Sequence, residues 1–219
     1  MLRFLIASFS LVFLAQAAPP MTPPIRIALV FDDGPAPEQA PKLLEILASR
    51  GVRATFAHVG ETMSQHPQVA RLISERGHEI ANHSLRHRDP DSLSPSELQE
   101  QIQRSQAIMA STLDTAPRWY WPPFLKTSES IREACRSAGI ALYEPASIVV
   151  SQDYDTSVSA DEIERLATTG VTDGAVILFH EWRKETADRL PAILDELKRQ
   201  GCVFHTFTEL HQAVAASAP

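Results

Sequence analysis

The chain has 219 residues, of which 44% are hydrophobic and 21% are charged, a composition typical of globular proteins and sufficient for one substantial core. Its formal net charge is −7 and its sequence pI is about 5.6. The chain therefore lacks the basic surface with which proteins neutralise a phosphate backbone, which argues against a nucleic acid partner and favours a neutral or cationic one.

The first 24 residues indicate export followed by a linker. A positive start at Arg3, an apolar run at 4–14 and the sequence Ala-Gln-Ala at 15–17 form the pattern of a secretory signal peptide covering residues 1–17. A membrane anchor is the alternative, but the apolar run is shorter than the roughly 20 residues that cross a bilayer. We therefore expect a secreted or periplasmic protein without a membrane span after removal of the signal. Four prolines within 18–24 predict an extended linker, which leaves residues 25–212 for the folded domain.

Short β-type runs alternate with amphipathic stretches from residue 25 onward. The predicted strands are 25–31, 54–59, 79–82, 118–121, 140–143, 175–179 and 203–207. Helices lie between them: Gly51 and Gly77 end two of these, and a capping box from Ser94 to Glu97 opens a third that runs to Leu113. This order predicts an α/β fold of parallel strands joined by right-handed crossovers, either a doubly wound sheet or a barrel.

Two polar clusters follow predicted strands. Asp32 and Asp33 come after the first strand, and His83 and His87 come after the third. Together they supply three oxygen and nitrogen ligands for a divalent cation and one spare carboxylate, and three protein ligands leave an open position for water. Taken singly, a turn and a solvated helical face explain the same residues. Their order along one chain favours the metal site.

These residues resemble the motifs of the NodB-type polysaccharide deacetylases, carbohydrate esterase family 4. Residues 31–35 are similar to the family's T-F-D-D-G-P, residues 76–87 to R-G-H-E-[IV]-[GA]-N-H-[ST]-x-x-H, and residues 178–180 to the terminal L-x-H. The similarity extends over residues 25–210. It implies the distorted (β/α) barrel of this family and removal of N-acetyl groups from an N-acetylglucosamine-containing polysaccharide or oligosaccharide, chitin-like or peptidoglycan, with release of acetate.

The resemblance also implies a role for each site residue. Asp33, His83 and His87 would hold a divalent metal, with zinc the cation that this ligand set suits best. Asp32 would be the general base and His180 the general acid, although a lone histidine after an apolar strand, as His180 is, is more often a hydrogen-bonded core residue. Adjacent strand residues project oppositely, so the two aspartates require an irregular turn, which the following Gly-Pro favours.

The third motif departs from the family pattern, F-R-P-P-Y-G, in which the arginine pairs with the catalytic aspartate. Trp121 stands at the arginine position, and Pro123 keeps a matching proline. Because an indole carries no charge, either the pKa of Asp32 is raised or another cation reaches it. Arg118 is the candidate for that cation; the alternative is that it is a surface strand residue.

The fourth motif, D-x-x-D-W, is also altered. Residues 150–154 begin with Val150, keep the second aspartate as Asp153, and end in Tyr154 where the family has tryptophan. We expect Asp153 to orient a neighbouring polar group and Tyr154, with Leu178 of the last motif, to line the substrate site. A charged turn is the alternative explanation for this segment.

The sequence leaves two questions open, the activity and the pairing of the two cysteines. The altered motifs permit a carbohydrate-binding pseudoenzyme with impaired turnover, or a deacylase of a different acylated substrate, besides the deacetylase. Cys135 and Cys202 could pair in an exported protein or could be two buried thiols.

Overall fold

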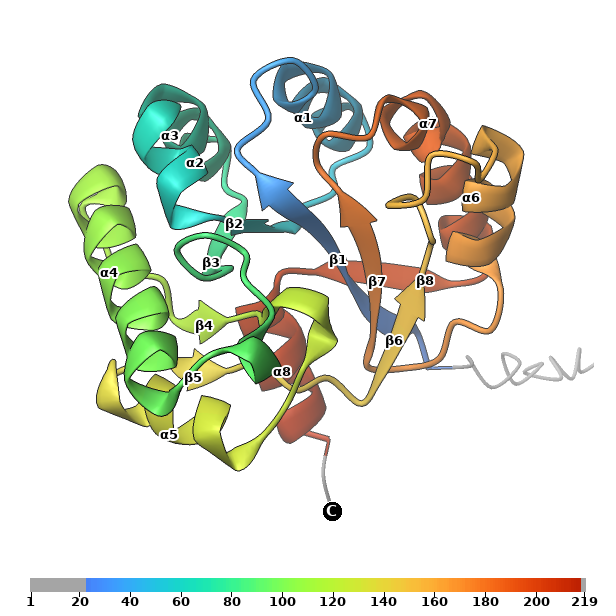
Figure 1. Cartoon of the computed structure of the whole chain (residues 1–219). Helices are drawn as coiled ribbons and strands as arrows, with labels where there is room; N and C mark the ends of the chain where they lie inside the picture. Colours follow the sequence, from blue (N-terminus) through green and yellow to red (C-terminus); the bar gives the residue numbers. More distant parts are fainter. Residues whose placement is uncertain (1–22, 218–219) are drawn as a thin grey trace, which may run out of the picture.

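The computed structural model describes residues 23–217 (Figure 1). The predicted signal peptide and residues 18–22 of the predicted linker lie outside the described residues. Within residues 23–217, no helix combines the length and hydrophobicity that a membrane span requires.

The described residues form one curled sheet of parallel strands. The strands are β1 (Ile25–Gly34), β2 (Thr55–His58), β3 (Glu79–Asn82), β4 (Trp119–Tyr120), β5 (Ala141–Leu142), β6 (Ser147–Val150), β7 (Ala175–His180) and β8 (Cys202–His205). Their order is β5-β4-β3-β2-β1-β7-β6, with β8 paired to the first half of β1. Since no pairing joins β5 to β6 in this part of the chain, the sheet is an open, distorted (β/α) barrel, and the predicted fold class is confirmed. The sequence prediction missed only β6.

Most helices lie on the outside of the curled sheet, and the last one packs against its inner face (Figure 1). The helices are α1 (Ala40–Ser49), α2 (Gly60–Gln65), α3 (Pro67–Glu75), α4 (Pro95–Leu113), α5 (Glu129–Ser137), α6 (Ala160–Thr168), α7 (Lys184–Arg199) and α8 (Phe207–Ala215), with 3₁₀ turns at Pro90–Ser92 and Pro123–Leu125. The predicted helix ends are confirmed. Gly51 and Gly77, whose φ angles are +62° and +83°, each follow a helix, and Ser94 and Glu97 form the capping box of α4.

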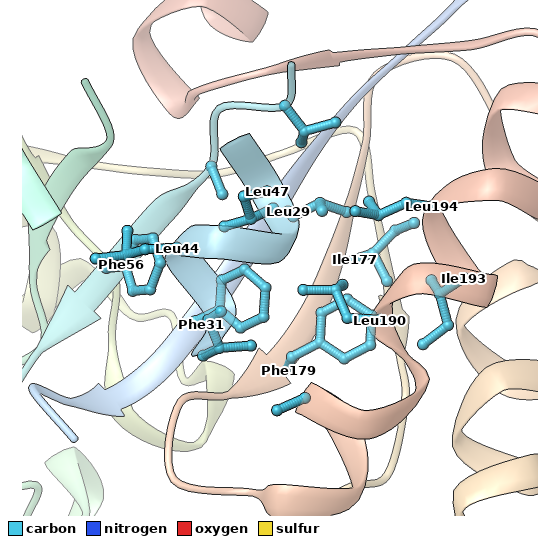
Figure 2. Packing of buried hydrophobic residues seen from close by; sticks show 14 of the residues in the cluster. Leu29, Phe31, Leu44, Leu47, Phe56, Ile177, Phe179, Leu190, Ile193 and Leu194 are labelled. Atoms are coloured by element: carbon cyan, nitrogen blue, oxygen red, sulfur yellow. The ribbon is translucent and has the colours of Figure 1, made fainter. Parts of the chain in front are cut away.

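The main core lies between the sheet and helices α1 and α7 (Figure 2). Phe31 is its centre, with its ring centroid 5.1 Å from that of Phe56 and 5.5 Å from that of Phe179. Ala28 and Val30 point to the other face of β1, into a second cluster that α8 covers with Phe207 and Leu210. Because side chains alternate along a strand, Asp32 follows Ala28 and Val30 onto this inner face.

Removal of the Phe31 ring should lower the free energy of unfolding substantially. We expect Phe31→Ala to lower the free energy of unfolding by about 3–5 kcal/mol, because the lost burial leaves a cavity between two packed layers. Equilibrium urea denaturation of the full chain measures this change. A loss below about 1 kcal/mol would show that the layer can collapse around the gap.

The two cysteines lie in different elements. Cys135 is in α5 and Cys202 in β8, and both are buried free thiols. The pairing that the sequence left open is therefore not formed.

Candidate functional site

A bulge at the end of β1 turns both aspartates toward one pocket. In the pairing with β2, Asp32 is opposite Ala57 but Gly34 is opposite His58, so Asp33 is an extra residue. Its φ of +68° is left-handed. On a regular strand the two side chains would point to opposite faces, and a bulge re-aims one of them. The irregularity thus lies one residue before the glycine at which the sequence predicted it.

The two histidines lie on the loop after β3. Trp121 offers its carbonyl oxygen to His83 Nδ1 at 2.6 Å; a carbonyl only accepts, so Nδ1 carries the proton and Nε2 has a free lone pair. The backbone N–H of His83 donates to the His58 carbonyl at 2.9 Å, and that of His87 donates to Ser84 Oγ at 3.0 Å. Both Ser84 and His87 are left-handed, with φ of +67° and +51°. Strained positions therefore gather at this loop.

Asp33, His83 and His87 converge, each offering one ligand atom, and these atoms lie within 4.8 Å of one another. Asp33 Oδ1 lies 3.2 Å from His87 Nε2 and 3.5 Å from His83 Nε2, yet it is buried and forms no hydrogen bond within residues 23–217. Burial opposes ionisation of Asp33, but the neighbouring imidazoles, His83 first, hold its pKa below the usual range. An ionised carboxylate that turns a free oxygen toward two imidazoles fits a divalent cation.

Asp32 lies beside this cluster, and no charged side chain of the described residues donates a hydrogen bond to it. The Trp121 indole N–H donates to Asp32 Oδ2 at 2.9 Å, and that oxygen lies 3.8 Å from His83 Nε2. Asp32 Oδ1 is buried and has no partner among the described residues. Burial raises the pKa of Asp32 to about 6, although the charges of His83 and His180 oppose the rise. One oxygen is therefore fixed and the other is free to accept a proton.

The structure places Arg118 away from Asp32. The guanidinium of Arg118 lies over the ring of Trp119, 5.1 Å from its centroid, and the residue is exposed. Of the two alternatives for Arg118, the structure therefore supports the surface residue, and the candidate role as a substitute cation is wrong: the donor to Asp32 is the Trp121 indole. Trp121 is buried, with its ring centroid 5.3 Å from that of Phe207, so packing fixes the direction of the N–H.

His180 faces the pocket from the end of β7. Its Nδ1 lies 2.7 Å from Asp153 Oδ1, while Asp153 Oδ2 accepts from the His180 backbone N–H at 2.9 Å and from Thr186 Oγ1 at 2.6 Å. Burial lowers the pKa of His180, but the bond to Asp153 and the charges of Asp32 and Asp33 outweigh it, so the net shift is upward. The expectation that Asp153 orients a polar group matches this contact.

A cavity of about 550 Å³ joins these groups. It is lined by Asp32, Asp33, His83, His87, Phe124, Leu125, Val150, Tyr154, Leu178 and His180. Phe124 and Tyr154 are 57% and 56% exposed, and Trp182, 39% exposed, donates its indole N–H to Asp33 Oδ2 at 3.3 Å. Exposed aromatic faces beside polar groups suit sugar rings. Pro123 is buried and does not line the cavity, so its expected place in the substrate site is not observed.

Two residues beside the site were not predicted from the sequence. His58 and Glu181 are completely buried at the ends of β2 and β7, with His58 Nε2 2.9 Å from Glu181 Oε2. The sequence did contain an indication of them, because each is a titratable residue directly at the end of an apolar strand. Barrel active sites lie at these carboxyl ends of the strands.

The chain is similar to known deacetylases. A family model described as polysaccharide deacetylase matches residues 20–143. A peptidoglycan-N-acetylglucosamine deacetylase of Bacillus cereus is 30% identical over 195 residues, which cover 85% of this chain and 68% of that protein. The peptidoglycan-N-acetylglucosamine deacetylase PgdA of Listeria monocytogenes is 31% identical over 186 residues, covering 85% of this chain. The chain spans only 39% of the length of that relative.

A solved structure has the same architecture. The family 4 acetyl xylan esterase from Clostridium thermocellum, in complex with a cobalt ion, aligns with a TM-score of 0.77 at 28% identity, covering 87% of this chain and 92% of that one. Three observations therefore point to the same family: the sequence match, the open barrel and the position of the site at the carboxyl ends of its strands. The chain belongs to the polysaccharide deacetylases, the NodB-type proteins of carbohydrate esterase family 4.

Proposed function

We propose that this protein is a metal-dependent hydrolase that removes N-acetyl groups from an N-acetylglucosamine-containing polysaccharide or oligosaccharide, chitin-like or peptidoglycan. The single observation that carries the proposal is the convergence of Asp33, His83 and His87 beside the unpaired oxygen of Asp32. The substrate class rests on the names of the B. cereus and L. monocytogenes relatives.

Asp33, His83 and His87 would hold the divalent cation, with zinc the best match to one carboxylate and two imidazoles. Bound there, the cation supplies Lewis acidity toward water and the acyl carbonyl. The cobalt ion in the C. thermocellum esterase supports a divalent metal in this fold. The proton on His83 Nδ1, held by the Trp121 carbonyl, keeps Nε2 available as a ligand.

Asp32 and His180 divide the proton transfers between them. Asp32 takes a proton from the attacking water at Oδ1 while the Trp121 indole holds Oδ2. His180 gives a proton from Nε2 to the departing amine nitrogen as the C–N bond breaks, and acetate and a free amine leave. Asp153 holds the other ring nitrogen and stabilises the imidazolium.

Export supplies the setting for this chemistry. We infer that residues 1–17 are removed as a signal peptide, that 18–24 link the start to a domain at 25–212, and that the protein meets its acetylated glycan outside the cytoplasm. Sequencing the amino terminus of the exported protein tests this directly. A start near Ala18 is expected, and an intact Met1 on the exported protein would contradict it.

Acetate release tests the activity. Peptidoglycan, acetylated chito-oligosaccharides and acetylated xylan are incubated with zinc-loaded protein, and we expect release from at least one of the two N-acetylated glycans. Release only from xylan would favour the deacylase of a different substrate. Intact substrates with tight glycan binding would favour the pseudoenzyme. That protein class is the second candidate because the uncharged Trp121 stands at the arginine position of the family motif.

The indole N–H of Trp121 should matter for turnover. Trp121→Phe preserves an aromatic ring in the buried cluster but removes the donor to Asp32 Oδ2. We expect kcat for acetate release to fall roughly 10- to 100-fold, since a hydrogen bond to a charged group is worth about 1.5–3 kcal/mol. Trp119→Phe is the matched control, because its indole donates to Thr208 Oγ1 instead. Equal activity of wild type and Trp121→Phe would contradict this role.

Asp153 should set the basic limb of the pH profile. His180 must be protonated to act as an acid, and the negative charge of Asp153 stabilises that form. Asp153→Asn removes the charge, so the pKa of His180 falls and the basic limb of kcat/KM moves to lower pH. The pH dependence of acetate release measures this shift. An unchanged limb, or a shift to higher pH, would assign the limb to another group.

A further inference from the structure

A buried histidine and glutamate contact each other at the strand ends beside the proposed metal site. His58 ends β2 and Glu181 follows β7, on the two sides of β1, and both residues are 0% exposed. His58 Nε2 lies 2.9 Å from Glu181 Oε2. Neither side chain lines the cavity that holds Asp32 and His180. Any effect of the pair on the site therefore passes through the residues that it contacts.

Its contacts join the three strand ends that carry the site. Glu181 Oε1 accepts the backbone N–H of Ala36 at 2.8 Å, just beyond the bulge. The Glu181 backbone N–H donates to the Asp32 carbonyl at 2.9 Å, and the His58 carbonyl accepts the backbone N–H of His83 at 2.9 Å. The Glu181 carboxylate thus contacts the segment just after the bulge, while the backbone bonds place the strand ends of Glu181 and His58 beside those of Asp32 and His83.

The carboxylate also fills the space beneath the bulge. A Cβ atom at Gly34 would lie 1.7 Å from Glu181 Oε2 and 2.8 Å from His58 Cδ2. Gly34 follows the left-handed Asp33 and allows the carboxylate to approach the backbone this closely. A shift of Glu181 would therefore leave the bulge without the group that it packs against.

Stability alone does not account for this arrangement. Burying two ionisable groups carries a desolvation penalty, and an apolar pair of similar volume is often as stable. His58 Nδ1 is buried without a partner among the described residues, which adds to the cost. A left-handed aspartate persists only where its surroundings fix it. A rigid, hydrogen-bonded pair supplies such surroundings.

We propose that His58 and Glu181 are positioning residues that hold Asp33 in its left-handed conformation, facing His83 and His87. The inference rests on the proposed metal site and adds two residues that touch neither metal nor substrate. They act by fixing the backbone on both sides of β1. Their loss should weaken metal binding before it weakens the fold.

Metal affinity tests this role without reference to turnover. Metal-stripped full-length protein is titrated with zinc against a chromophoric chelator, and Tm is recorded for each variant. We expect Glu181→Ala to weaken zinc binding about 10- to 100-fold, as removal of supporting groups around metal ligands does. Glu181→Gln keeps an oxygen for the Ala36 N–H and should lose roughly 3- to 10-fold.

His78→Ala is the matched control. The His78 Nδ1 accepts the backbone N–H of Ala54 at 3.1 Å, so it too is a buried imidazole bound to β2, but at the opposite end of the strand. This variant should lower Tm and leave zinc affinity within about twofold. If His78→Ala lost as much zinc affinity as Glu181→Ala, the loss would reflect a general destabilisation of the fold. That result would overturn the positioning role of His58 and Glu181.

The remaining outcomes are also decisive. Native zinc affinity in Glu181→Ala overturns the inference and leaves the proposed function intact. If Glu181→Ala does not fold, Glu181→Gln decides by the same criterion. Absence of zinc binding by the wild type overturns the metal site itself, and with it both proposals.

Discussion

Replacing Asp32 with asparagine is expected to lower kcat for acetate release roughly 100- to 10,000-fold, the range that a general base contributes. Asparagine keeps the shape of the side chain and an oxygen for the Trp121 indole, but it cannot take a proton at the free position. Zinc content should be unchanged, because the ligand atoms belong to other residues. Acetate assays and elemental analysis on the same preparation measure both quantities.

Asp114→Asn is the control for this change. Asp114 is a left-handed residue after α4, remote from the pocket, and asparagine tolerates that conformation. Its activity should equal that of the wild type. Retention of activity by Asp32→Asn would remove the general base from the account.

The pH profile of the wild type should also reflect Asp32. Because the pKa of Asp32 is about 6, activity should rise as pH increases toward that value. A bound cation would move this acidic limb of the profile to lower pH.

Replacing His83 with alanine is expected to weaken zinc binding by more than about 100-fold, beyond the effect of a supporting group, and to abolish acetate release. His83 supplies a ligand atom, and its loss also leaves the Trp121 carbonyl without a donor. We therefore expect a drop of about 1–3 kcal/mol in the free energy of unfolding as well. Zinc titration and urea denaturation separate the two effects.

His66→Ala serves as the control for the second change. His66 lies at the start of α3, outside the ligand cluster. Its replacement should leave zinc affinity and acetate release at wild-type values. A His83→Ala protein that binds zinc as tightly as the wild type would contradict the ligand set.

The ligand cluster could be predicted because its signal is local. Asp32 and Asp33 are adjacent, and His83 and His87 lie within five residues of each other, so short motifs contain the chemistry. The barrel could not be derived from periodicity, because strand order depends on pairings between distant segments. The resemblance to the deacetylases supplied it. The strand β6 was missed because it has only four half-buried residues at the edge of the sheet.

The supporting contacts were beyond a sequence argument. His58 and Glu181 are 123 residues apart, and the indole of Trp121 meets Asp32 across 89 residues. The direction of an indole N–H depends on the rings packed around it, which no motif records. For that reason the sequence left open whether Asp32 has a raised pKa or another cation as its partner, and the structure shows an uncharged donor and a raised pKa.

Anomalous scattering at the zinc edge from a crystal of zinc-loaded protein tests the central claim most directly. We predict one peak within about 2.0–2.2 Å of a carboxylate oxygen of Asp33 and of Nε2 of both His83 and His87. Asp32 should lie beside the peak and outside its ligands. A map with no peak among these three side chains, or one in which they point apart, would contradict the proposed metal centre.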